Sequence, residues 1–103
     1  MSVDSLSEGR PKNRTVRVRI TGRVQGVCFR AWTERTASAL GLSGWVCNRR
    51  DGAVEALFSG AADKVAEMLA RCRVGPPAAL VEDVAAVEEI GAAPEGFSIL
   101  PAV

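Results

Sequence analysis

The sequence contains neither histidine nor tyrosine. The absence of histidine excludes Ser-His-Asp and Cys-His mechanisms, a phosphohistidine relay, and any metal centre that depends on imidazole ligands. Catalysis by this chain would therefore have to use arginine, amide, carboxylate, hydroxyl or backbone groups.

Long apolar runs are also absent, and cysteine is scarce. No apolar segment approaches the about 20 residues that a membrane-spanning helix requires, so we expect no membrane partner. The three cysteines, Cys28, Cys47 and Cys72, are an odd number at unrelated spacings. This pattern argues against a disulfide framework and against a zinc site. We therefore expect a cytoplasmic protein that binds no metal.

The chain has little net charge. Its 13 Lys and Arg residues and 12 Asp and Glu residues leave a formal charge of +1, which does not create the basic field that attracts nucleic acid. Any anion-binding site must therefore be local. A length of 103 residues suits one domain with a modest core. We expect residues 1–13 to form a flexible tail and residues 14–103 to form the domain.

Hydrophobic periodicity predicts two helices among several short strands. The predicted strands are 16–21, 44–48, 53–58, 81–90 and 97–100; the predicted helices are 31–40 and a second one that opens at Ser59-Gly60 and stops at Gly75-Pro76-Pro77. The predicted apolar faces are Trp32, Thr36, Ala39 and Leu40 on the first helix and Val65, Met68, Leu69 and Cys72 on the second.

The order of these elements predicts the fold class. Strand, helix, strand, strand, helix, strand is the split βαβ pattern. We therefore expect an α+β, ferredoxin-like βαββαβ sandwich, in which an antiparallel sheet carries both helices on one face.

The segment GRVQGVCFR, residues 22–30, connects the first strand to the first helix. Glycine-bearing turns and helix N-termini expose backbone N–H groups that attract anions, and Arg30 adds a planar, permanently charged donor. The segment therefore predicts an oxyanion site, most plausibly for phosphate. It lacks the Gly-Lys-Ser/Thr ending of the Walker motif and the glycine spacing of the dinucleotide motif. The alternative is a plain turn with a solvated arginine.

The predicted topology brings Arg30 and Asn48 to one edge of the sheet. The first and second strands of a ferredoxin-like sheet are parallel, with the third between them, so their C-terminal ends lie at the same edge. Because neighbouring strands are about 4.8 Å apart, these two backbones should be about 10 Å apart. Both side chains could then reach one small group held between them.

Two linked motifs resemble the acylphosphatases. GRVQGVCFR at 22–30 is similar to that family's phosphate loop, and LGLSGWVCNRRDGAVEA at 40–56 contains its Gly-Trp-Val-x-Asn and Asp-Gly-x-Val-Glu patterns. GPPAALVEDV at 75–84 and the late Phe97-Ser98-Ile99 are similar to the family's C-terminal half. The resemblance covers roughly residues 15–100.

The resemblance implies hydrolysis of the carboxyl–phosphate bond of acyl phosphates to carboxylate and inorganic phosphate, without metal or cofactor. By position in the motifs, Arg30 would bind the phosphate and Asn48 would orient the attacking water. Backbone N–H groups would also bind the phosphate, those of Gln25, Gly26, Val27, Cys28 and Phe29. Cys47 departs from the basic residue of many relatives, and we expect it to alter surface charge more than chemistry.

Neighbouring side chains have plainer interpretations. Cys28 is expected to be a small packing residue, Asp51 with Gly52 to form a turn, and Glu55 to face solvent.

Two other functions remain open from the residues. A non-catalytic module of the same fold could bind phosphate or an acyl phosphate without turnover. Ferredoxin-like sheets can also bind RNA through aromatic side chains on central strands, but the first strand has none and the third has only Phe58. We therefore expect a small-molecule acyl phosphate as the partner, no nucleic acid, and a monomer.

Overall fold

The computed structural model describes residues 12–103. The predicted tail, residues 1–13, therefore lies almost entirely outside the described residues, and Asn13 already belongs to the first strand. The elements, in chain order, are β1 (Asn13–Arg23), α2 (Phe29–Ala39), β2 (Ser43–Asn48), β3 (Val54–Ala61), α3 (Ala62–Cys72), β4 (Leu80–Glu88) and β5 (Phe97–Ile99). Neither helix of this part of the chain is long and apolar enough to cross a membrane.

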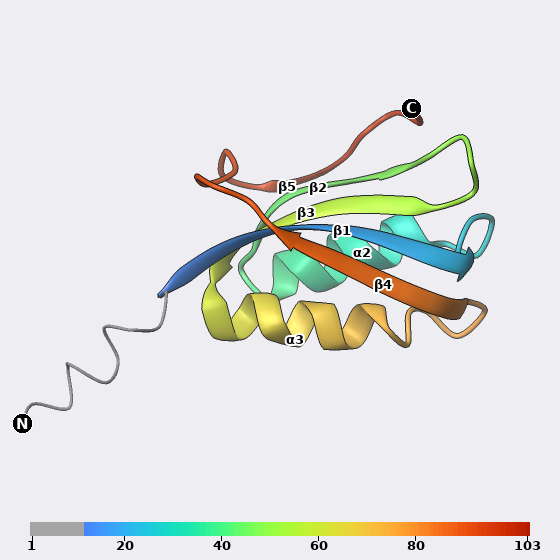
Figure 1. The fold of residues 1–103 in the computed structure, drawn as a ribbon, viewed down its shortest axis with the longest axis horizontal. Coiled ribbons are helices and arrows are strands. Elements are labelled where there is room, and N and C mark those ends of the chain that lie inside the picture. Colours follow the sequence, from blue (N-terminus) through green and yellow to red (C-terminus); the bar gives the residue numbers. More distant parts are fainter. Residues whose placement is uncertain (1–11) are drawn as a thin grey trace, which may run out of the picture.

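The strands form one sheet in the order β4-β1-β3-β2-β5. Both helices lie against the same side of this sheet (Figure 1), so the ferredoxin-like α+β prediction is confirmed. The sheet is mixed rather than wholly antiparallel, because β5 pairs with β2 in parallel. The central place of β3 makes β1 and β2 parallel to each other, as the predicted geometry of the site requires.

The core lies between the sheet and the helices. The alternation predicted for the first strand is confirmed, since Val16, Val18 and Ile20 are buried while Arg17 and Arg19 are exposed. On α3 the predicted face is also confirmed, with Val65, Met68 and Cys72 fully buried and Leu69 partly buried.

The predicted face of the first helix is wrong by a rotation of about one residue. Phe29, Thr33 and Ala37 are its buried residues, whereas Trp32 and Leu40 are only partly buried against the core. The hydroxyl of Thr33 is satisfied because it donates to the Phe29 carbonyl at 2.8 Å. A buried threonine is thus compatible with this face. Because threonine is polar, the apolar periodicity of the sequence does not indicate that Thr33 belongs to the buried face.

Helix α2 begins at Phe29, two residues earlier than predicted, so Arg30 lies within its first turn. The helix ends just before Gly41, as the glycine predicts. Gly41 has φ +73°, its N–H donates to the Ser38 carbonyl, and the Leu42 N–H donates to the Ala37 carbonyl at 2.9 Å. This pair of bonds is the Schellman motif, which directs the chain into β2.

The prediction that the second helix opens at Ser59-Gly60 is wrong. Both residues belong to β3, where Ser59 pairs with Thr15 on one side and with Ser43 on the other. The buried hydroxyls of Thr15 and Ser59 lie 2.8 Å apart and share a hydrogen bond. Strand pairing on both sides therefore extends β3 through a Ser-Gly step that resembles a helix start.

Candidate active site

The turn between β1 and α2 contains two residues in the left-handed region of backbone conformation. Gly26 has φ +74° and Cys28 has φ +65°, both in the left-handed region, whereas Val27 between them does not. Turns that contain left-handed residues can bring successive N–H groups together into a concavity that binds anions. Cys28 is also the N-cap of α2, and its side chain makes no capping hydrogen bond.

Arg30 lies in the first turn of α2 and is partly buried. The first turn of α2 contains no acidic residue, so its free N–H groups are not neutralised by a carboxylate of the helix itself. Within residues 12–103, none of the ion pairs involves Arg30. A partly buried arginine without a carboxylate partner is available to bind a phosphoryl group.

Asn48 is the last residue of β2, and its side-chain oxygen has no partner. Oδ1 is buried and is the one such atom without a hydrogen bond in the described part of the chain. Its backbone is held firmly, because the Val103 N–H donates to the Asn48 carbonyl at 3.1 Å and the Arg50 N–H donates to the Val103 carbonyl at 3.0 Å. A fixed, unsatisfied acceptor is suited to bind a water or a substrate N–H or O–H group.

One cavity of about 460 Å³ contains both Arg30 and Asn48 in its lining. The expected proximity of the helix start and the end of β2 is therefore present in the structure. The lining residues are Val24, Gln25, Gly26, Cys28, Phe29, Arg30, Ala31, Asn48 and Ile99. Val27 is not among them; its side chain packs against the core, and its N–H remains a predicted phosphate donor.

Sequence reasoning missed two contributors to this site. Ile99 of β5 lines the cavity although its side chain is chemically inert and lies far away in the chain. The side chain of Gln25 bonds to the β2–β3 hairpin, through Nε2 to the carbonyls of Arg49 and Ala53. Nothing in the sequence pattern signals either contact, because both depend on the pairing of distant elements.

The two cysteines nearest the site differ in burial from what the sequence predicts. Cys28 is exposed instead of packed, because the left-handed turn directs it away from the core. Cys47 is 2% exposed, so it cannot alter the surface charge as expected. Burial raises the pKa of the Cys47 thiol, Glu55 adds to the rise, and the guanidiniums of Arg49 and Arg30 oppose it.

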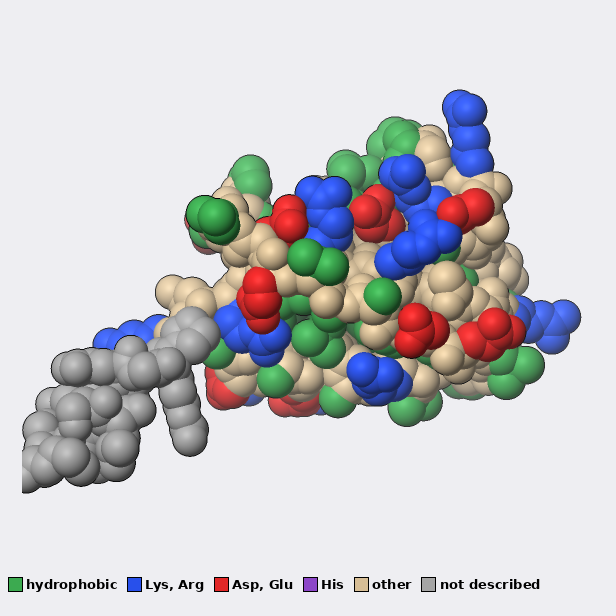
Figure 2. All heavy atoms as spheres, viewed as in Figure 1, with side chains coloured by type: hydrophobic (Ala, Val, Ile, Leu, Met, Phe, Trp, Pro, Cys, Tyr) green, Lys and Arg blue, Asp and Glu red, His purple; other side chains and the backbone are tan. Residues whose placement is uncertain are grey.

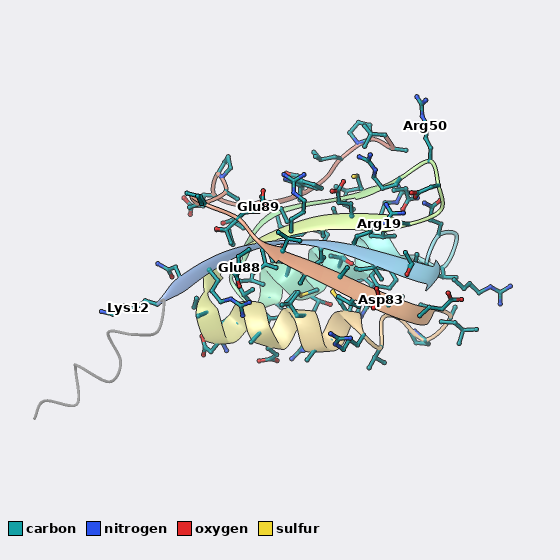
Figure 3. The ribbon with its side chains drawn as sticks, in the orientation of Figure 1. Lys12, Arg19, Arg50, Asp83, Glu88 and Glu89 are labelled. Atoms are coloured by element: carbon teal, nitrogen blue, oxygen red, sulfur yellow. The ribbon has the colours of Figure 1, made fainter. Side chains whose placement is uncertain are left out.

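The β2–β3 hairpin beside the site is held by charged side chains. Asp51 Oδ1 accepts the Ala53 N–H at 3.1 Å, which confirms its predicted role in the turn. It also pairs with Arg19 of β1, and this hydrogen bond lowers the pKa of Asp51. Glu55, expected to face solvent, is only 18% exposed and pairs with Arg17 and Arg49. Arg50 extends outward from the hairpin (Figure 3).

Comparisons with known proteins agree with this geometry. A family model described as Acylphosphatase matches residues 16–99. The chain is 49% identical over 94 residues to the acylphosphatase of Rhizorhabdus wittichii, and the alignment covers 91% of this chain and 95% of that protein. It is 58% identical over 90 residues to the acylphosphatase of Nitrobacter hamburgensis, with coverage of 82% and 91%.

A solved structure gives the same result. The structure of an acylphosphatase from Coxiella burnetii superposes with a TM-score of 0.84 at 31% identity, and the match covers 86% of this chain and 94% of that one. Each match spans nearly the whole length of the relative, and the family model covers almost all of the described residues. The chain belongs to the acylphosphatase family.

Proposed function

We propose that Arg30, the backbone N–H groups of residues 25–30 and Asn48 carry out the hydrolysis of an acyl phosphate. The family establishes the activity: the chain is an enzyme that acts on acyl phosphates and releases phosphate. The proposal concerns the assignment of roles to residues. Its main support is that the unpartnered Oδ1 of Asn48 and the unpaired guanidinium of Arg30 border one cavity.

The phosphoryl group would bind at the 25–30 turn. Converging N–H groups and the bidentate guanidinium of Arg30 would hold its non-bridging oxygens, whose charge redistributes in the transition state. Phosphoryl transfer depends mainly on such positioning and charge stabilisation.

Asn48 would hold the attacking water. Its Oδ1 accepts one water hydrogen, which orients a lone pair of the water toward phosphorus. The water oxygen forms a new bond to phosphorus, the bond from phosphorus to the acyl oxygen breaks, and the carboxylate leaves with that electron pair. The proton of the water passes to a phosphoryl oxygen or to solvent, because an amide is too weak a base to take it.

A non-catalytic phosphate-binding module is the less favoured function. The chain matches curated acylphosphatases over 91–95% of their length, and no observation favours binding without turnover. Binding of RNA is also disfavoured, because Phe58 is fully buried and cannot stack on a base. Positive and negative side chains are mixed on the face that Figure 2 shows.

The remaining expectations are part of the proposal. They are a monomeric protein, a cytoplasmic location, and a reaction without metal or cofactor. The free state of all three cysteines is consistent with the proposed location, and sedimentation equilibrium tests the proposed monomer.

Replacement of Arg30 tests the proposed phosphate site. Arg30→Ala should abolish measurable release of phosphate from benzoyl phosphate, while circular dichroism shows an intact fold. Arg30→Lys should also lower kcat/KM at least about 100-fold, because a point charge loses the two-pronged geometry. A folded Arg30→Ala protein with near wild-type turnover would contradict the assignment.

Replacement of Asn48 tests the water site separately. Asn48→Ala should lower kcat by about 100-fold or more, as expected for loss of a group that positions the nucleophile. The inhibition constant of inorganic phosphate should change less than about 3-fold, since the anion is held elsewhere. If the inhibition constant rises and kcat is spared, the roles of Asn48 and Arg30 are misassigned.

A further inference from the structure

The side chain of Gln25 bridges the phosphate-binding turn and the β2–β3 hairpin. Its Nε2 donates to the Arg49 carbonyl at 2.7 Å and to the Ala53 carbonyl at 2.9 Å. These two residues close the hairpin, because the Arg49 N–H donates to the Ala53 carbonyl at 2.8 Å. Gln25 thus attaches to the base of the hairpin, next to Asn48 in the chain.

Both acceptors are backbone carbonyls, so the bridge requires two donors on one atom. An amide nitrogen carries two hydrogens, and here each has its own partner. A carboxylate of the same shape has no hydrogen to donate, and a methyl group makes no hydrogen bond. The contact is therefore specific to an amide, which makes it possible to remove the bridge with almost no change in volume.

The bridge spans the two halves of the candidate site. Gln25 belongs to the turn that would hold the phosphoryl group, and Arg49 directly follows Asn48. In the sheet these halves are separated by β3, since the strand order is β1-β3-β2. The distance from phosphorus to the attacking water depends on this separation, and a misplacement of about 1 Å can cost about 100-fold in rate.

We propose that Gln25 is a positioning residue that fixes Asn48 relative to the phosphate-binding turn. The inference rests on the proposed function, because it assigns a role in that same site. Gln25 acts through its side-chain amide on the hairpin, in addition to the N–H donation predicted for its backbone. Because Gln25 bonds to the base of the hairpin, the distance between the bound anion and the attacking water does not depend on the conformation of the exposed hairpin tip.

A second link to the same hairpin provides the matched control. Arg19 of β1 pairs with Asp51 at the turn, and both side chains are about half exposed. This ion pair joins the hairpin to β1 and does not involve the 25–30 turn. Arg19→Gln therefore removes a contact to the hairpin and leaves the phosphate-binding turn attached to it. Figure 3 shows Arg19 extending from β1.

The test compares Gln25→Glu and Gln25→Ala with Arg19→Gln and wild type, in turnover of benzoyl phosphate and in inhibition by inorganic phosphate. Gln25→Ala should lower kcat about 10- to 100-fold and change the phosphate inhibition constant less than about 3-fold. Gln25→Glu should lower kcat at least as much and also raise that constant, because it adds a carboxylate to the lining of the cavity. Arg19→Gln should change both less than about 2-fold, since an exposed ion pair contributes little. Thermal melting verifies that every variant is folded at the assay temperature.

A double-substitution cycle shows whether Gln25 acts through Asn48. In the Asn48→Ala background, Gln25→Ala should change kcat less than about 2-fold, because the group that Gln25 positions is gone. An additive loss in that background overturns the proposal, as does wild-type kcat in both single Gln25 variants. A rise of the phosphate inhibition constant in Gln25→Ala that matches its loss of kcat also overturns the proposal, since Gln25 then shapes only the anion site.

The proposed function and this inference fail in different ways. If Arg30→Ala and Asn48→Ala keep wild-type turnover of benzoyl phosphate, the proposed function fails. The Asn48 side-chain amide resonances then test the bridge on their own. They should shift in Gln25→Ala and stay unchanged in Arg19→Gln, and unshifted resonances in Gln25→Ala overturn the inference.

Discussion

At the scale of single residues, Cys28 occupies a backbone conformation that suits glycine. Its φ of +65° and ψ of +25° lie in the left-handed region, which costs a residue with a side chain about 1–2 kcal/mol. The side chain is exposed and makes no capping hydrogen bond. No capping hydrogen bond offsets this cost, so the backbone is strained at the residue that precedes α2.

Cys28→Gly should therefore be more stable than Cys28→Ala. Alanine keeps the strain and loses the thiol, whereas glycine removes the strain at the expense of a more flexible unfolded chain. We expect a difference of about 0.5–1 kcal/mol in the free energy of unfolding, measured by urea denaturation under reducing conditions. Equal stabilities would mean that the turn relaxes around the side chain.

The proximity of the two proposed catalytic residues was predictable from motifs and strand order. Arg30 and Asn48 could be assigned to one edge of the sheet because strand order fixes which ends meet, and the cavity contains both. The bridge from Gln25 and the wall formed by Ile99 could not be foreseen. Both contacts depend on how elements that are far apart in the chain pack against each other. The sequence pattern does not contain this information.

At the scale of secondary-structure elements, β2 depends on a close approach of two backbones. Gly44 has φ +140°, and a Cβ built there would lie 1.8 Å from the carbonyl oxygen of Leu57 on β3. That neighbour is backbone in a central strand and cannot move aside. A side chain at this position would push β2, which carries Asn48, away from β3.

Gly44→Ala should destabilise the protein by about 3 kcal/mol or more, since overpacking against fixed backbone adds to conformational strain. Gly52→Ala is the matched control in the hairpin turn. Gly52 has φ +99° and nothing within 4 Å of the added Cβ, so only strain of about 1–2 kcal/mol is expected. Guanidinium denaturation measures both variants, and similar losses would show that the clash at Gly44 is relieved.

The elements themselves were predictable except where pairing decides their limits. Every predicted strand and helix is present, because alternation and glycine stops are local signals. The predicted boundary between β3 and α3 was wrong, because Ser59 pairs with residues of both neighbouring strands and therefore belongs to the sheet. The parallel direction of β5 was also missed, because it depends on the path of residues 89–96 across the end of the sheet.

At the scale of the whole molecule, a buried thiol links global stability to pH. Cys72 is fully buried on α3, and burial raises the pKa of its thiol from 9.0 to about 12. Below pH 9 the thiol is neutral in both the folded and the unfolded chain. Between pH 9 and 12 the unfolded chain loses this proton while the folded chain keeps it, so stability decreases as the pH rises.

The free energy of unfolding should thus decrease by about 1.4 kcal/mol per pH unit above pH 9 on account of Cys72. Cys72→Ala removes the titrating group and serves as the control. It should be less stable at pH 8 because of the cavity, but its loss between pH 8 and 10.5 should be about 2 kcal/mol smaller than that of wild type. Urea denaturation with a reductant measures both proteins, and the absence of tyrosine removes phenol titration from this range. Parallel pH profiles would mean that Cys72 reaches solvent in the folded state.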